Sequence, residues 1–292
     1  MPRAGIVTVV GKPNVGKSTL LNRIVGQKLS ITSAKPQSTR DRIVGIYSTG
    51  DAQMVILDTP GLLNPRYPLQ QAMRATALRA VEDADVIVYL ADATEGDPPP
   101  LNVAAELPSL PRSPIITALN KSDAISSARR TATSADDDLI YISALTGDGI
   151  PELMAKVAGQ LPESPFLYPE DEISTQPVRF FVAELVRETV LEQLHDEVPY
   201  SVAVQVEEYR EDRSPLYIRA VIYVERDSQK AIIIGSKGAQ IRRLGESARK
   251  KIETFVGSKV YLDLWVKVLA NWRKNPGSLS RFGYELATGK RK

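Results

Sequence analysis

Short apolar runs alternate with amphipathic segments along the first half of the chain. Runs rich in Val, Ile and Leu predict buried strands at residues 4–10, 43–48, 53–57, 85–91, 114–119 and 139–142. Helical periodicity lies between them, most clearly at residues 18–25, 69–82 and 151–160. Strands that alternate with helices are typical of an α/β domain, with a mostly parallel sheet and helices on both faces. We expect this domain to occupy residues 1–161.

A different pattern follows Leu161. Several prolines punctuate a polar, acidic stretch, which predicts an extended linker at residues 162–176. The chain then predicts a helix at 178–195, strands at 200–208 and 216–224, helices at 228–234 and 239–255, and a strand at 259–266. We therefore expect a second, smaller α+β domain at residues 177–292.

The overall composition of the 292-residue chain is that of a globular protein. It is 43% hydrophobic and 25% charged, and no apolar run approaches the roughly 18 residues that a membrane span needs. The absence of cysteine excludes disulfides and thiolate metal sites. Residues 1–5 lead directly into the first predicted strand, so we expect no signal peptide and a cytoplasmic location.

Charge is distributed unevenly along the chain. From residue 218 to the end there are 17 Lys or Arg and 6 Asp or Glu, an excess of 11 positive charges. Since the whole chain carries +2, the preceding 217 residues carry −9. This asymmetry favours a polyanion, such as a nucleic acid, as the partner of the C-terminal part. A basic surface that is merely solvated is the alternative.

A complete phosphate-binding loop follows the first predicted strand. Residues 11–18 read Gly-Lys-Pro-Asn-Val-Gly-Lys-Ser, and backbone N–H groups of such a loop point at phosphates. Lys17 is expected to reach the β- and γ-phosphates, and the Ser18 hydroxyl to ligate Mg²⁺. The candidate phosphate-binding residues are Gly11, Asn14, Val15, Gly16, Lys17, Ser18 and Thr19.

Two further segments are expected at the γ-phosphate. Asp58-Thr59-Pro60-Gly61 follows a predicted strand, so Asp58 can hold Mg²⁺ through water and the Gly61 N–H can sense the phosphate. The polar stretch 35–40 suits a loop that orders around the γ-phosphate. Thr39 is our choice of Mg²⁺ ligand from this loop, with Ser38 as the alternative. Lys17, Thr39 and Gly61 are the candidate catalytic residues.

Asn120-Lys121-Ser122-Asp123 indicates that the base is guanine. Guanine presents two donors side by side that one carboxylate can accept, whereas adenine does not. A carboxylate left unpaired against adenine would cost several kcal/mol, so Asp123 is the expected discriminator. Asn120 and Lys121 would brace the loop and the base. The later triplet Ser143-Ala144-Leu145 can present a backbone N–H to the guanine O6.

The order of these motifs and their residues resemble those of the Era family of translation-factor-related GTPases. The resemblance spans most of the chain and implies binding of GTP and GDP with Mg²⁺, and hydrolysis of GTP. Leu62 stands where many GTPases carry a water-orienting glutamine, and members of the Era family likewise lack that glutamine. We therefore expect slow intrinsic turnover, roughly 10⁻⁴ to 10⁻² s⁻¹. Asn14 occupies the position at which relatives are thought to bind K⁺.

The second domain contains Gly235-Ser236-Lys237-Gly238 between two predicted helices. A Gly-x-x-Gly loop lets a nucleic-acid backbone come close, and in this context the domain resembles the type II KH fold. We expect Ile232, Ile233, Ile241 and Leu244 to form an apolar floor beside the loop. The candidate RNA-binding residues are Ile234, Gly235, Ser236, Lys237, Gly238, Ile241 and Arg242. Trp272 and Tyr284 are interpreted as structural anchors rather than base contacts.

The resemblance further implies a partner and a role. It implies a monomer that binds small-subunit ribosomal RNA near its 3′ end and assists assembly of the small ribosomal subunit, with peripheral contact to the inner face of the cell membrane. Residues 124–138 and the prolines at 98–100 depart from the family pattern and predict shortened helices. The main rival hypothesis is an RNA-binding module whose guanine nucleotide is structural and never turned over. An RNA-modifying enzyme is the last choice, because no nucleophile or cofactor loop supports it.

Overall fold

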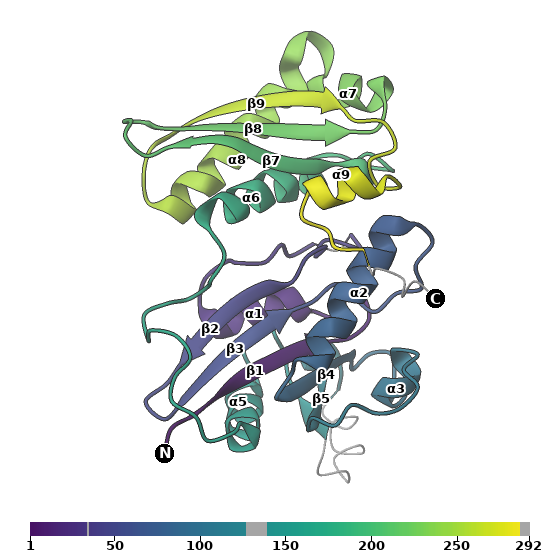
Figure 1. The fold of residues 1–292 in the computed structure, drawn as a ribbon, viewed down its shortest axis with the longest axis vertical. Helices are drawn as coiled ribbons and strands as arrows, with labels where there is room; N and C mark the ends of the chain where they lie inside the picture. Colours follow the sequence, from purple (N-terminus) through teal and green to yellow (C-terminus); the bar gives the residue numbers. More distant parts are fainter. Residues whose placement is uncertain (34, 127–138, 287–292) are drawn as a thin grey trace. The chain divides into compact units, whose positions relative to one another are not determined.

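The computed structural model describes residues 1–33, 35–126 and 139–286 of the chain. Contacts divide the chain into two compact units (Figure 1). The first comprises residues 1–65 and 73–175, and the second comprises residues 66–72 and 176–292. Among the described residues, no helix is both long and apolar enough to cross a bilayer.

The first unit is built on a six-stranded sheet in the order β2-β3-β1-β4-β5-β6. Only the β2–β3 pair is antiparallel, and the other neighbours are parallel, so the predicted α/β class is confirmed. The strands are β1 (Arg3–Val10), β2 (Ile43–Ser48), β3 (Ala52–Asp58), β4 (Val86–Asp92), β5 (Ile115–Asn120) and β6 (Leu139–Tyr141). Strands β3 and β4 are buried along their whole length, which explains their continuous apolar runs.

Helices cover both faces of this sheet (Figure 1). Helix α2 (Pro68–Glu82) packs on one face, where the Thr8 hydroxyl donates to the Ala80 carbonyl. Helix α1 (Lys17–Val25) packs on the other face, against Gly45, and α5 (Ile150–Gln160) contacts β1, β3 and β5. Helix α3 (Leu101–Ala104) is only four residues long, as the prolines before it predict. Most of the predicted departure at 124–138 lies outside the described residues.

The predicted linker is bound to the edge of the first sheet. Its residues 162–175 belong by contact to the first unit, and they run beside the edge strand β2 (Figure 1). The buried side chain of Gln53 donates to the Tyr168 carbonyl at 2.8 Å and accepts the Leu167 N–H at 2.7 Å. On β2, the Ile46 N–H donates to the Ile173 carbonyl at 2.9 Å. The segment is therefore held by specific hydrogen bonds up to its last residues.

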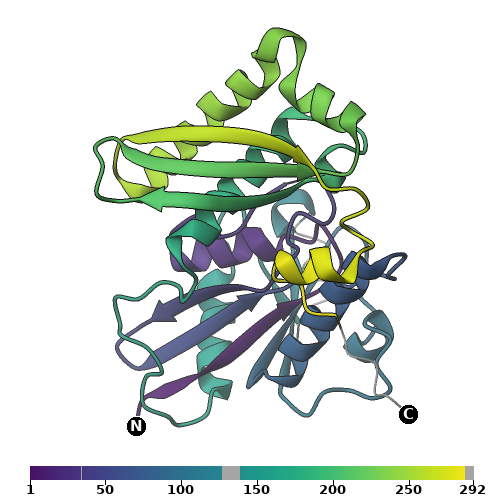
Figure 2. The same cartoon turned by 45° about the horizontal axis from the view of Figure 1, so that its top comes forward.

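The second unit has a three-stranded sheet in the order β7-β8-β9, antiparallel and then parallel. Its strands are β7 (Ala203–Arg210), β8 (Leu216–Val224) and β9 (Val260–Val268). Figures 1 and 2 show the helices on one side of the sheet, namely α6 (Val178–Gln193), α7 (Asp227–Ile234) and α8 (Ala239–Val256). The core lies between, where inward residues of β8 such as Ile218 and Ile222 meet Val186 and Leu244.

The predicted strand at 200–208 is displaced toward the C-terminus. Residues Pro199–Ser201 form a 3₁₀ turn instead, and β7 begins at Ala203. The Ser201 hydroxyl donates to the Val198 carbonyl at 2.8 Å, and the proline ring fixes the turn geometry. His195 is exposed just beyond the end of α6, and among the described residues it belongs to no group of three or more potential metal ligands of the His, Cys, Asp or Glu type.

The C-terminal segment anchors the second unit through Trp272. This indole is fully buried, donates from Nε1 to the Ser201 carbonyl at 2.7 Å, and lies edge-on to Phe282 and stacked with Tyr284. The structural interpretation of Trp272 and Tyr284 is therefore supported. Helix α9 (Pro276–Arg281) precedes Phe282, whose ring lies 5.2 Å from that of Tyr223.

Trp272→Ala is expected to destabilise the second unit by roughly 3–5 kcal/mol, because it leaves a large cavity and an unpaired Ser201 carbonyl. The chain's other tryptophan, Trp265, is 51% exposed and serves as the matched control. Trp265→Ala should change the free energy of unfolding by about 1 kcal/mol or less. Urea denaturation followed by circular dichroism measures both. Equal destabilisation by the two substitutions would contradict the anchoring role of Trp272.

Candidate functional site

One pocket of about 440 Å³ lies at the carboxyl edge of the first sheet. Its walls come from the loops that follow β1, β3, β5 and β6, and from the loop that precedes β2. This is the place where open α/β sheets bind ligands, because the carboxyl ends of parallel strands meet there. The predicted site residues that line it are Asn14, Gly16, Lys17, Ser18, Thr19, Thr39, Gly61, Asn120, Lys121, Asp123, Ala144 and Leu145.

Other predicted residues lie directly behind this wall. Gly11, Val15, Asp58 and Ser143 each hydrogen-bond to a residue that lines the pocket. Several further lining residues were not among the predicted site residues, namely Pro13, Ile31, Thr32, Ser33, Gln37 and Ala124. Pro13 lies inside the phosphate loop and Gln37 inside the 35–40 stretch, and the others precede or follow a recognised motif by a few positions. Proximity to a motif was the available signal, but their own residue types carry no signature.

The Lys17 side chain is hydrogen-bonded to the backbone of the phosphate loop. Its Nζ donates to the carbonyls of Gly11 at 3.1 Å and Lys12 at 2.9 Å, so the ammonium lies inside the curve of the loop. Burial lowers the pKa of Lys17 to about 8, although the nearby Asp58 carboxylate opposes that shift. An anion bound in the loop would restore the charged form, because an opposite charge favours protonation of the amine.

Two positions of the site require glycine because neighbouring atoms lie too close for a Cβ. Gly16 has φ +99°, and a Cβ there would lie 2.2 Å from Nδ2 of Asn120. A Cβ on Gly61 would lie 2.8 Å from the backbone nitrogen of Pro13, so the 58–61 loop is packed against the phosphate loop. Any side chain at either position would separate loops that together form the pocket.

Three hydroxyl groups gather on one carboxylate beneath the phosphate loop. Oδ2 of Asp58 accepts from the hydroxyls of Ser18 at 2.7 Å and Ser30 at 2.6 Å, and lies 3.4 Å from the Thr39 hydroxyl. The Ser18 and Thr39 hydroxyls are 2.9 Å apart. Burial raises the pKa of Asp58, while Lys17 and the three hydroxyls counteract the shift. Ser30 was missed by sequence analysis, since a single serine outside a motif gives no signal.

This oxygen cluster fits a magnesium ion. Oδ1 of Asp58 is fully buried and has no hydrogen-bond partner in the described part of the chain. A buried carboxylate oxygen without a partner is costly, and hard oxygen ligands are those that Mg²⁺ prefers. Ser18 and Thr39 could supply hydroxyl ligands, with Asp58 behind them. Thr39 rather than the alternative Ser38 is the residue whose hydroxyl lies beside Ser18.

Asn120 joins the phosphate loop to the opposite wall. Its Nδ2 donates to the Val15 carbonyl at 2.7 Å, and its Oδ1 accepts the Ala144 N–H at 2.8 Å. The Ala144 N–H is thus bonded to Asn120, and the Ser143 N–H donates to the Asp148 carbonyl. Of the predicted triplet, Leu145 therefore carries the N–H that remains for a base. Asn120 therefore connects the phosphate loop to the loop after β6.

The side chains of Lys121 and Asp123 in the same motif are each held by a partner. Lys121 forms an ion pair with Asp92 at 2.5 Å, a contact that the sequence motif does not reveal. Oδ1 of Asp123 accepts the Ser143 hydroxyl at 2.6 Å, which orients the carboxylate at the pocket. A carboxylate fixed in this way can accept two parallel N–H donors from a planar ring.

The side chain of Leu62 does not line the pocket. Its side chain is buried in the core beside Val81 and Tyr89, and its backbone N–H donates to the Gly11 carbonyl at 3.0 Å. The position after Gly61 therefore stabilises the fold of the loop and offers no polar group to a water molecule.

In the second unit, the Gly-x-x-Gly loop connects α7 to α8. Gly235 has φ +71° and Gly238 φ +76°, and Ser236 and Lys237 are exposed between them. Ile232 is 48% exposed beside the loop, whereas Ile234 and Ile241 are partly buried against the core. Arg242 is exposed on the first turn of α8.

The expected apolar floor is only partly correct. Ile233 and Leu244 are completely buried in the core of the second unit, so they cannot touch a ligand. Helical geometry explains why Ile233 is buried while Ile232 is exposed, because consecutive residues of a helix point about 100° apart. Of residues 232–234 in α7, only Ile233 points fully into the core. Ile232 and Ile241 remain as the accessible apolar residues of the predicted set.

Family models match both units. The model described as 50S ribosome-binding GTPase matches residues 6–121, and a KH domain model matches residues 197–273. GTPase Era of Carboxydothermus hydrogenoformans is 42% identical over 291 residues, which cover 97% of this chain and 98% of the relative. GTPase Era of Geobacter sp. (strain M21) is 43% identical with the same coverage.

Solved structures agree over nearly the full length. A variant of Aquifex aeolicus Era bound to GDP and AlF₄⁻ superposes with a TM-score of 0.89 at 38% identity, covering 97% of this chain and 100% of that one. Era in complex with MgGDPNP and nucleotides 1506–1542 of 16S ribosomal RNA gives the same score and identity, covering 98% of this chain and 100% of that one. The chain therefore belongs to the Era family of GTPases, with a P-loop GTPase domain followed by a KH domain.

Proposed function

We propose that this GTPase is a switch that binds small-subunit ribosomal RNA near its 3′ end and assists assembly of the small ribosomal subunit. The observation that carries the proposal is a guanine-type phosphate-loop pocket in the same chain as a basic unit with an exposed Gly-x-x-Gly loop. The Era relative bound to MgGDPNP and 16S ribosomal RNA supports it.

GTP and Mg²⁺ would be held by the side chains that already converge. Lys17 lies inside the loop that would cradle the β- and γ-phosphates, and Ser18, Thr39 and Asp58 would hold the ion. The ion would neutralise charge on the phosphate oxygens. The Gly61 N–H would contact the γ-phosphate. Since Leu62 is buried, no side chain at that position orients water, and we propose slow intrinsic hydrolysis.

We propose further assignments that follow the family. The GTP-binding domain is residues 1–161, the linker 162–176 and the KH-like domain 177–292. Asn14, which lines the pocket, would bind K⁺. The protein would act as a monomer in the cytoplasm, with peripheral contact to the inner face of the membrane.

The RNA surface is proposed to centre on the Gly-x-x-Gly loop. Gly235 and Gly238 have the backbone angles that let a phosphate chain approach, and Lys237 between them is exposed. Arg242 adds a second exposed cation one helical turn away. Ile234 and Ile241 supply apolar surface for the bases.

Hydrogen bonds between β2 and the linker suggest how the nucleotide site could be coupled to the second unit. Strand β2 begins at Ile43, four residues after Thr39, and the Val44 and Ile46 backbone groups bind Ser174 and Ile173 of the linker. A change in the 35–40 loop on loss of the γ-phosphate would therefore act on the strand that holds the linker. We propose that nucleotide state controls RNA binding through this connection.

Coupling predicts that RNA affinity differs between the GDP form and the form with a non-hydrolysable GTP analogue. A nucleotide can change the RNA affinity only to the extent that it binds the two conformations with different affinities. Such coupling is typically 5- to 150-fold, or about 1–3 kcal/mol. Fluorescence anisotropy with a 16S 3′-end oligonucleotide measures both. Equal affinities would contradict the switch. If single-turnover assays also showed no phosphate release with or without RNA, the rival with a structural nucleotide would be favoured.

Asp123→Asn should transfer preference from guanine to xanthine nucleotides, because the amide donates to the 2-oxo group that replaces the amino group. GTP affinity is expected to fall at least ~100-fold, equivalent to about 2.7 kcal/mol. Isothermal calorimetry with GTP and XTP measures the change. Asp51→Asn, in the exposed turn between β2 and β3, is the control and should leave both affinities unchanged. Unaltered GTP binding by Asp123→Asn would remove Asp123 as discriminator.

Ser236→Asp combined with Lys237→Asp should abolish RNA binding and leave GTP affinity intact, because negative charge replaces a phosphate contact. The matched control is Ser109→Asp with Arg112→Asp, which makes the same charge change in the exposed loop between α3 and β5 of the first unit. The control should bind RNA less than ~10-fold more weakly. Loss of RNA binding in both variants would indicate a general charge effect and not a specific loop contact.

A further inference from the structure

The second sheet has an outer face that the proposed RNA surface does not use. Alternate residues of β8 point inward to the helices, as Ile218 and Ile222 do, and the residues between them point outward. At one end of this outer face, Phe282 and Arg281 cover Tyr223. The other end carries two large exposed rings, Tyr261 at 59% and Trp265 at 51% exposure.

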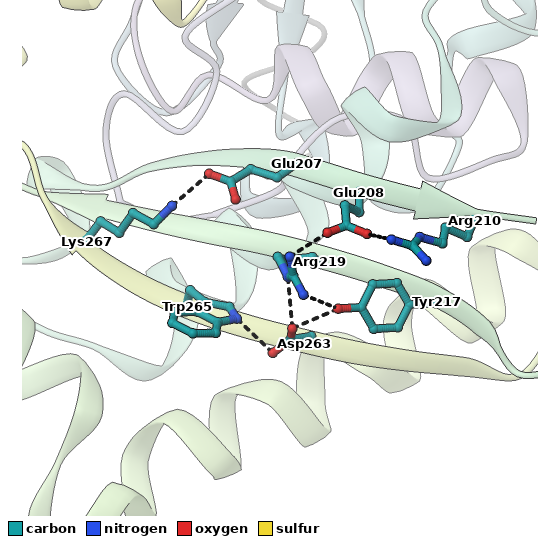
Figure 3. Close-up of polar contacts among 8 residues, drawn as sticks. All are labelled: Glu207, Glu208, Arg210, Tyr217, Arg219, Asp263, Trp265 and Lys267. Atoms are coloured by element: carbon teal, nitrogen blue, oxygen red, sulfur yellow. Dashed lines mark hydrogen bonds and ion pairs between the residues drawn. The ribbon is translucent and has the colours of Figure 1, made fainter.

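A hydrogen-bonded cluster fixes the groups at this end (Figure 3). Asp263 accepts the Trp265 indole N–H at 3.0 Å through Oδ1, and the Tyr217 hydroxyl at 2.9 Å and Arg219 Nε at 3.0 Å through Oδ2. Arg219 also pairs with Glu208. We call Tyr217, Arg219, Tyr261, Asp263 and Trp265 the outer-face platform. The polar atoms of Tyr217, Arg219, Asp263 and Trp265 hold one another in place across β8 and β9 (Figure 3).

The platform therefore offers ring faces to a partner. The indole N–H of Trp265 is already donated, and the Tyr217 hydroxyl is bonded to Asp263 and Arg219. The Tyr217 ring stacks on Tyr261 at 5.8 Å between centroids, with an angle of 12° between the planes. Preorganised flat rings on a sheet are the surface on which successive bases of single-stranded nucleic acid stack.

The acidic side chains on this face are paired with basic ones, so they do not strongly repel a polyanion. Asp263 and Glu208 are both paired with Arg219, and Glu207 is paired with Lys267 at 3.0 Å. Burial alone would raise the pKa of Asp263, but hydrogen bonds from Trp265, Arg219 and Tyr217 lower it. The guanidinium of Arg213 lies 5.7 Å from the Tyr217 ring centre, at the loop end of the platform.

Strand β9 connects the platform to the proposed RNA surface. It is an edge strand, and its inward residue Leu264 lies beside Gly245 of α8, the helix that begins at the Gly-x-x-Gly loop. Its outward residues include the two rings Tyr261 and Trp265, about 13 Å apart along the strand. A polynucleotide that passes from the loop around the free edge of β9 would meet these two rings.

We propose that the outer-face platform stacks bases of single-stranded RNA, and so extends the RNA contact past the Gly-x-x-Gly loop. This inference rests on the proposed RNA-binding function. Protein interfaces are also enriched in Trp, Tyr and Arg, but continuity with the loop surface through β9 favours RNA. A protein partner is the alternative outcome of the test.

The test compares a variant with Tyr261→Thr and Trp265→Thr with the intact chain. Threonine suits a strand, so the sheet should be retained, and unchanged GTP affinity and circular dichroism would verify folding. The probes are single-stranded oligonucleotides of about 4 nucleotides, enough for a Gly-x-x-Gly loop, and of about 12 nucleotides. The variant should bind the long probe roughly 5- to 150-fold more weakly and the short probe equally well.

A second variant with Tyr261→Phe and Trp265→Phe keeps the aromatic rings and should retain most of the affinity for the long probe. In the intact chain, the long probe should also quench the fluorescence of exposed Trp265, while Trp272 is buried and shielded. Equal affinity of the threonine variant and the intact chain for the long probe would overturn the inference and leave a protein partner as the explanation. Failure of the intact chain to bind either probe would instead contradict the proposed function.

Discussion

The nucleotide pocket depends on one buried amide. Asn120 donates to the carbonyl of Val15 in the phosphate loop and accepts the N–H of Ala144 in the last loop of the sheet, so a single side chain sets the distance between the two walls. Gly16 lies so close to Nδ2 of Asn120 that no Cβ could be accommodated. Asp123, the proposed base discriminator, is therefore placed relative to the phosphate loop by short-range contacts. In the proposed function, selectivity for the base and binding of the phosphates follow from the same geometry.

Sequence periodicity predicts most of the first unit because its strands are buried on both faces. The expected strand at 43–48 is observed with the same bounds, and the others agree to within one residue at each end. Most residues of the pocket converge as expected because their motifs follow β1, β3, β5 and β6, and a parallel sheet brings the carboxyl ends of these strands together. The 35–40 loop instead precedes β2, whose first residue lies at the same edge because β2 is antiparallel to β3. Trp272 is anchored in the core, also as expected from the sequence.

What the sequence does not show depends on contacts between distant residues. Gln53 is a polar residue at the edge of an apolar run, and nothing local indicates that it binds the chain near Tyr168. Ile233 could not be distinguished from Ile232 until the orientation of α7 was known. The pairing of Asp263 with Arg219 and Trp265 likewise needs two strands in register, so the outer-face platform is visible only in the folded chain.

The central claim is that this site reads guanine through a fixed carboxylate and holds the triphosphate through the loop around Lys17. Isothermal calorimetry of the full chain with GTP and with ATP, each in the presence of Mg²⁺, tests it most directly. The account predicts that GTP binds at least ~1,000-fold more tightly than ATP, because a charged acceptor that the base covers but leaves unpaired, as adenine would, is costly. Comparable affinities for the two nucleotides would contradict it.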